Sequence, residues 1–315
     1  MTDPRRVLVL LGGRSAEREV SLNTGAQVAA ALEERGHEVA TIDTGEPGFM
    51  ARIESSGADV AFVCLHGRFG EDGTVQGLLE LLDLPYVGSG VLSSALAMNK
   101  VMSKHLYVME GLSTPPYVVL KRSTPVDVEA ITAELGPKTV VKPADEGSSV
   151  GMTIVSDPAL LGDAIEFAFS FDPLVLVERF EEGVEVTIGV IGNDDPVALP
   201  TLEIVPTNDF YDYESKYVPG MSRHIIPARV SEPVRAECQR LAVEAHRVLG
   251  CAGMSRSDTI VTPAGDVYLL ETNTIPGMTK TSLLPDAAAA AGIQFPELCG
   301  RLVELALEDW AVRRG

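Results

Sequence analysis

The stretch RSDTIVTPAGDVYLLETN, residues 256–273, decides the fold of the C-terminal half of this chain. Two apolar, β-branched runs, 259–262 and 267–270, flank the turn-forming residues PAGD, a pattern typical of a β-hairpin. A four-residue turn would place Thr262 opposite Val267. The stretch therefore predicts two antiparallel strands whose register can be counted outward from the turn.

The predicted register sets two acidic residues against each other. Counting outward places Asp258 opposite Glu271 and Arg256 opposite Asn273, with all four side chains on one face. Directly opposed Cβ atoms lie about 4.5 to 5.5 Å apart, where like charges repel, so a positive group is expected between the acids. The residues leave two candidates open: Arg256 itself, or a divalent cation such as Mg²⁺, for which Asp, Glu and Asn supply hard oxygen ligands.

The composition of the chain limits its class and its partners. A length of 315 residues predicts two or three compact units. A net charge of -20 argues against nucleic acid or an anionic membrane as the main partner. No stretch approaches the ~20 apolar residues needed to span a bilayer, and the short apolar run near the start favours a strand over a signal peptide. We therefore expect a cytoplasmic protein. Its four cysteines lack C-x-x-C spacing and are predicted to be buried free thiols: Cys64, Cys238, Cys251 and Cys299.

The first part of the chain alternates strands with helices. Apolar runs and helical periodicity predict strands at 7–11, 38–42 and 60–65, a helix that Gly36 ends, and a helix at 74–82. This alternation is typical of a small doubly wound, Rossmann-like unit ending near Gly90. Ligands of such sheets gather beyond the carboxyl ends of the strands, which places 12–17 and 66–70 at a candidate site.

Two further units are predicted after Gly90. The unit over 91–178 begins with one helix at 93–111 and contains strands at 139–142 and 151–155 that flank the loop ADEGSSVGM. The unit over 179–315 contains strands near 184–191 and 197–205, an irregular stretch at 206–220, a helix at 232–249, the hairpin and terminal helices.

Each polar group that could carry chemistry also has a structural interpretation. The loop ADEGSSVGM is not a Walker A motif, yet its glycines and serines suit a flap over phosphate oxygens one step after Lys142; a plain hairpin turn is the alternative. Glu17 lies near the first turn of a helix, where the helix dipole alone favours a carboxylate. His66 ends a strand, where a lone histidine is more often structural.

Two later segments are equally open. Lys216 and Tyr217 lie in a tyrosine-rich loop and could simply pack on the surface. After the hairpin, Gly277 could expose a backbone N–H and Ser282 a hydroxyl to a carboxylate ligand. Capping of the next helix by Ser282 is the rival explanation.

Six motifs, in order, resemble one family over nearly the whole chain: LGGRSAEREVSLNTG, LHGRFGEDGTVQGLLELLDLPYVGSG, KPADEGSSVGM, YDYESKY, SRSD and LLETNTIPGMTKTSLLP. The sequence is similar in all of them to the D-alanine:D-alanine ligases of the ATP-grasp superfamily. This resemblance implies an α/β fold of the ATP-grasp type. An N-terminal Rossmann-like parallel sheet (1–90) would precede two ATP-grasp subdomains (91–178 and 179–315), with ATP held between the two β-rich domains.

The resemblance also implies a role for each candidate residue. The residues expected around the two D-alanines are Glu17, His66, Ser148, Lys216, Tyr217, Arg256, Gly277 and Ser282. Those expected to contact ATP are Lys100, Lys142, Ser148, Ser149, Glu178 and Glu185. Asp258, Glu271 and Asn273 would hold two Mg²⁺ ions, with Mn²⁺ able to substitute, which favours the cation in the hairpin.

Within these sets the resemblance implies more specific tasks. Glu17 would bind the ammonium of the first D-alanine in a hydrogen-bonded trio with Ser148 and Tyr217. Arg256 and the Gly277 N–H would stabilise an oxyanion, while Lys216 and Ser282 would hold the second carboxylate. One departure is Arg179, where many relatives have lysine, which leaves its adenine-side contact open.

The activity that the resemblance implies is ATP-dependent joining of two D-alanines through a D-alanyl phosphate, for peptidoglycan precursors, by a homodimer that binds neither nucleic acid nor membrane. The loop at 206–222 would exclude water from the acyl phosphate. Two alternatives stay open: another acceptor such as D-lactate, against which Tyr217 argues, and a non-catalytic nucleotide-binding regulator, which would not need Arg256 as an oxyanion group.

Overall fold

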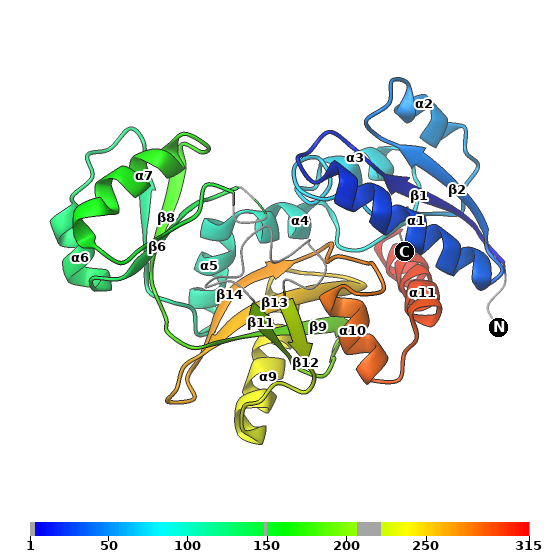
Figure 1. Ribbon diagram of the computed structural model, residues 1–315. Coiled ribbons are helices and arrows are strands. Elements are labelled where there is room, and N and C mark those ends of the chain that lie inside the picture. The colour runs from blue at the N-terminus through cyan, green and yellow to red at the C-terminus, as the bar shows by residue number, and fades with distance from the viewer. Residues whose placement is uncertain (1–3, 146, 148–149, 207–221, 315) are drawn as a thin grey trace.

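The computed structural model describes residues 4–145, 147, 150–206 and 222–314. Its first sheet is parallel, in the order β2-β1-β3-β4, and lies on the right of Figure 1. The strands and helices of this part are β1 (Arg6–Leu11), α1 (Arg18–Glu34), β2 (Glu38–Asp43), α2 (Phe49–Glu54), β3 (Val60–Val63), α3 (Thr74–Leu81) and β4 (Tyr86–Val87). The predicted Rossmann-like unit is confirmed, and Gly36 follows α1 with the positive φ expected of a residue that ends a helix.

The C-terminal helix packs on this first sheet. α10 (Leu283–Ala290) is followed by α11 (Phe295–Arg314), which contacts β3, β4 and α1 (Figure 1). Leu298, Leu302 and Val303 of α11 are buried in the same cluster as Val7 and Val9 of β1. The last helix thus closes the core of a sheet built from the other end of the chain, although chain order predicts it within the third unit.

The helix predicted over 93–111 is two helices. α4 (Val91–Met98) ends and α5 (Lys100–Met109) begins at Asn99, whose backbone is extended and whose side chain accepts a hydrogen bond from the N–H of Met102. An N-cap of this kind satisfies one of the free N–H groups at the start of a helix. The single-helix prediction is wrong because Asn99 begins a new helix in the middle of the periodic stretch.

The second sheet is antiparallel, in the order β5-β8-β6-β7, and lies on the left of Figure 1. The loop after β6 is flanked by strands, as predicted. The elements of this part are β5 (Tyr117–Lys121), α6 (Val128–Leu135), β6 (Thr139–Pro143), β7 (Thr153–Val155), the 3-10 helix η1 (Pro158–Leu160), α7 (Leu161–Phe169) and β8 (Leu174–Arg179). Leu135 of α6 and Ile165 of α7 are buried against Val141 and Val177 of the strands.

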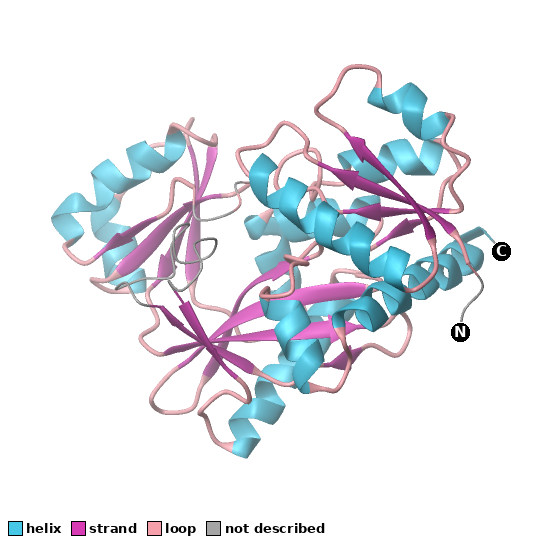
Figure 2. Cartoon of the chain, turned by 45° about the vertical axis from the view of Figure 1, so that its right-hand side comes forward, coloured by secondary structure: helices cyan, strands magenta, loops and turns pink. Residues whose placement is uncertain are grey.

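The third sheet contains the hairpin and has the order β12-β11-β9-β13-β14, with β10 paired to β9. Its elements are β9 (Val184–Ile191), β10 (Val197–Ala198), β11 (Leu202–Pro206), β12 (Ser222–Ile225), α9 (Glu232–Val248), β13 (Met254–Val261) and β14 (Val267–Asn273). The strand predicted near 197–205 is therefore divided into β10 and β11. Figure 2 shows the three sheets and the helices around them.

The hairpin register is partly as predicted. Asp258 pairs with Glu271 and Arg256 with Asn273, which is the expected pairing. Nearer the turn the prediction is wrong, because Val261 rather than Thr262 pairs with Val267. A register shift between Asp258 and Thr259, typical of a β-bulge, offsets the longer turn and restores the pairing of the acids.

Two further expectations concern the chain as a whole. All four cysteines are buried and free, as predicted. Within the described residues, none of the helices combines the length and the apolar character needed to cross a membrane.

Candidate active site

The loops at the carboxyl ends of β1 and β3 bring Glu17 and His66 together. Glu17 is buried before α1, and its side chain does not cap the helix. The Ser15 hydroxyl donates to the carbonyl of His66 at 2.8 Å and accepts from the N–H of Glu17 at 3.2 Å. A Cβ on Gly67 would lie 2.9 Å from Glu17 Oε2. Because Gly67 also has a positive φ, glycine is required for this close approach.

The surroundings of His66 are charged. Its ring is buried, its Nδ1 lies 3.9 Å from Glu71 Oε1, and its Nε2 has no hydrogen-bond partner among the described residues. Burial lowers the pKa of His66, but the carboxylates of Glu71 and Glu17 outweigh it and raise the pKa above its usual value, while Arg256 opposes them. The influence of Arg256 indicates that the hairpin faces the loops of the first sheet.

The loop after β6 also reaches Glu17. A Cβ on Gly147 would lie 3.8 Å from Glu17 Oε2, an ordinary contact distance. The neighbouring residues of that loop and of the tyrosine-rich loop that were predicted as site residues lie outside the described residues, so their roles stay predictions: Ser148, Ser149, Lys216 and Tyr217.

The hairpin holds its acids beside two cations. Arg256 forms a two-pronged ion pair with Asp258, with Nε–Oδ1 2.9 Å and Nη2–Oδ2 2.8 Å. The Thr187 hydroxyl of β9 also donates to Asp258 Oδ1 at 2.5 Å. Lys100, the first residue of α5, places its Nζ 3.7 Å from Glu271 Oε2. The two opposed carboxylates are therefore each neutralised by a different cation in this structure.

Asn273 completes the oxygen-bearing face of the hairpin. Its Nδ2 is buried and has no hydrogen-bond partner in the described part of the chain. No group of three or more His, Cys, Asp or Glu side chains among the described residues is arranged to hold a metal ion. The predicted metal set is instead two carboxylates and one amide, a combination of hard oxygen donors.

A second charged cluster lies where β6, β8 and α5 meet. Glu178 is buried between two lysines, with Oε2 2.8 Å from Lys142 Nζ and Oε1 2.9 Å from Lys104 Nζ. The side chain of Lys104 is 1% exposed, and its Nζ also lies 2.5 Å from the Thr114 hydroxyl. This arrangement compensates the desolvation of the Glu178 carboxylate with two charge-assisted contacts.

The pKa directions in this cluster follow from burial and charge. Burial raises the pKa of Glu178, but Lys104 and Lys142 outweigh it and hold the pKa below its usual value. For Lys142, burial is outweighed by Glu178 and Glu271, which raise its pKa. For Lys104, burial dominates and lowers the pKa despite Glu178. The charge of Lys142 is thus stabilised where a phosphate-binding group is predicted.

Gly277 and Ser282 are neighbours, as the predicted carboxylate and oxyanion site requires. A Cβ on Gly277 would lie 3.0 Å from Ser282 Oγ. Ser282 precedes α10, but its hydroxyl does not cap that helix. It accepts instead from the N–H of Thr279 at 3.1 Å. Ser282 is therefore the N-cap residue of α10 by position, but its hydroxyl does not make the capping hydrogen bond of the rival explanation.

Most of the described candidates therefore lie in one charged region. Glu185 of β9 pairs in register with Ile260 of β13 and raises the pKa of Lys142, so it borders the lysine cluster. The Arg179 side chain donates from Nε to Glu181 Oε1 at 2.7 Å.

Sequence reasoning missed Lys104 and Thr187. Lys104 follows Lys100 by four residues, a spacing that places both on one face of a helix and could have revealed it.

Comparisons with known proteins agree with this geometry. Residues 46–89 match the family model of the D-ala D-ala ligase N-terminus, and residues 106–304 match that of the D-ala D-ala ligase C-terminus. A D-alanine–D-alanine ligase of Pelotomaculum thermopropionicum is 50% identical over 98% of this chain and 99% of its own length. This chain belongs to the D-alanine–D-alanine ligase family.

Other members of the family support the same assignment. The ligase of Syntrophobacter fumaroxidans is 49% identical over 98% of this chain and 99% of its own length. The crystal structure of the Bacillus anthracis ligase complexed with ATP superimposes with a TM-score of 0.86 at 32% identity, over 98% of this chain and 99% of that chain. The predicted α/β ATP-grasp fold is confirmed.

Proposed function

We propose that this protein joins two D-alanines to D-alanyl-D-alanine at the expense of ATP, through a D-alanyl phosphate. The observation that carries the proposal is the gathering of charged groups from separate parts of the chain: Glu17 lies against the loops that contain Gly67 and Gly147, Lys100 pairs with the hairpin acid Glu271, and Lys142 pairs with Glu178. Similarity to D-alanine–D-alanine ligases over nearly the whole chain supports the same activity.

The hairpin residues fit a hard divalent cation. Asp258 and Glu271 are directly opposed, and Asn273 adds an amide oxygen on the same face. We propose that these three residues hold two Mg²⁺ ions, or Mn²⁺ in their place. Bound Mg²⁺ would neutralise phosphate charge during transfer. In this structure Arg256 pairs with Asp258, and Lys100 lies 3.7 Å from Glu271.

In the first step, the residues of the chain mainly bind and orient. Glu17 would accept the ammonium of the first D-alanine, which directs its carboxylate toward ATP. Lys142 and Lys100 would hold phosphate oxygens, and Glu178 fixes Lys142 by the 2.8 Å contact. Such positioning is the main protein contribution to phosphoryl transfer.

In the second step, the amine of the second D-alanine would attack the acyl phosphate, and phosphate would leave. The tetrahedral intermediate needs donors aimed at its oxyanion, a task suited to the Arg256 guanidinium and the Gly277 N–H. Ser282, adjacent to Gly277, would hold the second carboxylate together with Lys216.

The proposal includes the setting of the enzyme. We propose a homodimer that works in the cytoplasm on peptidoglycan precursors, with ATP and D-alanine as its small-molecule partners. Light scattering of the purified chain tests the dimer, for which twice the mass of 33.5 kDa is expected.

One assay tests the activity directly. Phosphate release from ATP should depend on D-alanine, and mass spectrometry should identify the dipeptide. Offering D-lactate beside D-alanine separates the proposed acceptor from the depsipeptide alternative. ATP binding without D-alanine-dependent phosphate release would support the regulator and contradict the ligase.

A further inference from the structure

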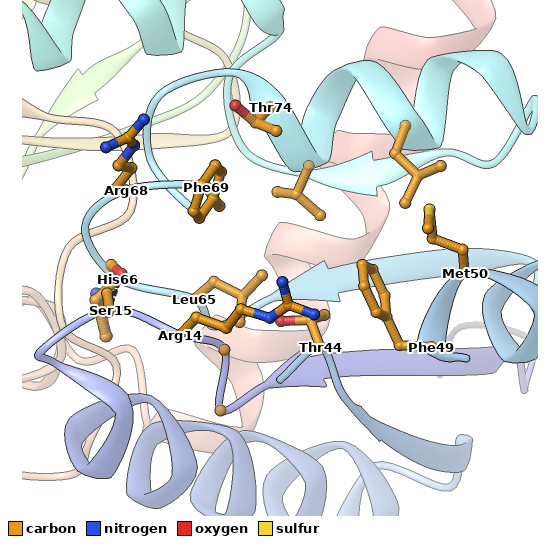
Figure 3. Close-up of a pocket in the computed structure, with 15 residues that line it drawn as sticks. Arg14, Ser15, Thr44, Phe49, Met50, Leu65, His66, Arg68, Phe69 and Thr74 are labelled. Carbon is orange, nitrogen blue, oxygen red and sulfur yellow. Dashed lines mark hydrogen bonds between the residues drawn. The ribbon is translucent and has the colours of Figure 1, made fainter. Parts of the chain in front are cut away.

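A separate cavity lies beside the candidate active site. It has a volume of about 240 Å³ and opens between the loops that follow β1, β2 and β3 (Figure 3). In the sheet order β2-β1-β3-β4, the chain passes from β1 to one neighbour and then returns to the other side with β3. The crevice at such a switch point, beyond the carboxyl ends of the strands, is where open α/β sheets bind ligands. None of the predicted ATP or metal residues lines it.

The cavity combines apolar walls with two guanidinium groups, those of Arg14 and Arg68. Leu65, Val75 and Leu78 form part of the wall, and Phe49 lies at one side. Figure 3 shows Arg14 reaching from the loop after β1 toward Thr44 and Phe49. Within the described part of the chain, no ion pair or hydrogen bond involves the Arg14 guanidinium.

Arg18, on the neighbouring helix, behaves differently from Arg14. Its guanidinium is bound by both oxygens of Asp43 at the end of β2. Of the two arginines that line the cavity, Arg68 lies over the Phe69 ring, with its guanidinium carbon 5.1 Å from the ring centroid, whereas Arg14 extends toward Thr44 and Phe49. A guanidinium beside apolar walls suits a carboxylate attached to an apolar body.

Phe69 also lines the cavity, and its backbone has an energetically unfavourable conformation. Its φ is +70°, in the left-handed region that a bulky side chain rarely adopts, and its side chain is 48% exposed. The N–H of Phe69 donates to Asp72 Oδ2 at 2.9 Å, which holds the backbone in this turn. The Arg68 guanidinium lies over this ring, 5.1 Å from its centroid, and the strained, exposed ring beside the cavity points to a further contact with a ligand.

We propose that this cavity is a binding site for a small organic monoanion: a carboxylate on Arg14, with an apolar or aromatic body against Phe49, Leu65 and Phe69. A single negative charge is favoured because Glu71 and Asp72 lie nearby on the chain and the protein carries a net charge of -20. The cavity is also small for a ligand pocket, which typically has a volume of about 300 to 1,000 Å³.

Occupancy should alter the first D-alanine site, an effect that rests on the proposed function. Ser15 and His66 line the cavity, and Ser15 also accepts a hydrogen bond from the N–H of Glu17. A ligand that fixes Ser15 and His66 would change the apparent KM for the first D-alanine. Reciprocally, D-alanine would change the affinity of the ligand.

Binding of 3-phenylpropionate, measured by calorimetry without ATP or D-alanine, tests the site itself. The parent should bind it, and Arg14→Met should weaken binding roughly 10- to 100-fold, since a charge-assisted contact is lost. Arg52→Met is the matched control, because Arg52 is an exposed arginine paired with Glu46 and does not line the cavity. The control should bind as the parent does.

Two further comparisons separate this site from nonspecific binding. Phe69→Gly should preserve or raise the melting temperature, because glycine adopts φ +70° without strain, yet weaken the probe about tenfold or more. The uncharged 3-phenylpropanol should bind more weakly than 3-phenylpropionate. Absence of binding up to about 10 mM, the weak end for so small a ligand, or binding unaffected by Arg14→Met, overturns the proposal.

A kinetic arm tests the coupling. Saturating 3-phenylpropionate should shift the KM for the first D-alanine in the parent and not in Arg14→Met. Binding with an unchanged KM overturns the coupling. Absence of D-alanine-dependent phosphate release in the parent contradicts the proposed function instead, while the calorimetric result still decides the site.

Discussion

Two groups of acidic side chains in this molecule are neutralised in different ways. Glu178 is one acid between two lysines, and its side chain is 2% exposed. In the hairpin, two opposed acids each have one cation, and the side chain of Glu271 is 29% exposed. The buried cluster pairs its single acid with two lysines of the chain itself. Under the proposed function, Mg²⁺ would take the place of Lys100 and Arg256 as the compensating charge of the hairpin acids.

The first prediction concerns the buried cluster and carries the largest expected effect. Glu178→Gln leaves the buried Lys104 and the partly buried Lys142 without their shared anion, so the free energy of unfolding should fall by about 3 to 5 kcal/mol. Urea unfolding at pH 7 measures this. Glu237→Gln, which breaks an exposed pair with Arg240, is the control and should cost about 0 to 1 kcal/mol. If Glu178→Gln lowers the free energy of unfolding no more than Glu237→Gln does, the buried cluster is no more stabilising than an exposed ion pair.

A smaller effect is expected from Thr187, a neutral partner of the hairpin acid Asp258. Thr187→Val keeps the shape of the side chain but removes the hydrogen bond to Asp258 Oδ1. Hydrogen bonds to charged groups contribute about 1.5 to 3 kcal/mol, and the free energy of unfolding should fall by that amount in EDTA. Thr187→Ser retains the hydroxyl and should recover most of the loss. If the serine variant is as unstable as the valine variant, packing rather than the hydrogen bond explains Thr187.

Asp43 provides an intermediate case whose pH dependence can be predicted. The Arg18 hydrogen bonds, helped by the N–H groups of Gly45 and Gly13, lower the pKa of Asp43 to about 2. A carboxylate with a lowered pKa stabilises the fold above its unfolded pKa of about 3.9 and loses that contribution as the pH falls toward 2. Because Arg18 is 40% exposed, Asp43→Asn should cost only about 1 to 2 kcal/mol at pH 7. The difference from the parent should shrink between about pH 5 and pH 3; a constant difference would assign it to packing.

The sequence alone predicts much of this architecture and fails at identifiable places. The first sheet and the loop after β6 are predictable because apolar runs, glycines and helical periodicity are local signals. The hairpin acids are paired as predicted although the turn is not, because the register shift after Asp258 offsets the longer turn. No local sequence pattern reliably signals a bulge of this kind. The pairing of Asp258 with Glu271 was predicted correctly because the longer turn and the bulge shift the register by one residue in opposite directions.

Other features depend on tertiary contacts. Asn99 divides a continuous helical pattern, and only its capping bond to Met102 reveals the break. α11 packs on the first sheet, which its amphipathic pattern cannot specify, since such a pattern marks a buried face and not the partner. In the site, motif positions identified the lysines that contact Glu178 and Glu271 except Lys104, whose role emerges only when α5 is placed against β8.

The most direct test is the thermal stability of Glu271→Gln with EDTA and with Mg²⁺ plus ATP. In EDTA the change should be below about 1 kcal/mol, because a long, half-buried contact with Lys100 is lost while repulsion from Asp258 is relieved. With ligand at about 100 times its Kd, the parent should gain about 2.7 kcal/mol by mass action. Asp266→Asn removes the same charge at the turn of the hairpin and should keep that gain, whereas Glu271→Gln should lose it. A Glu271→Gln protein that is clearly destabilised in EDTA and still gains the full stabilisation from Mg²⁺ and ATP would contradict the metal site.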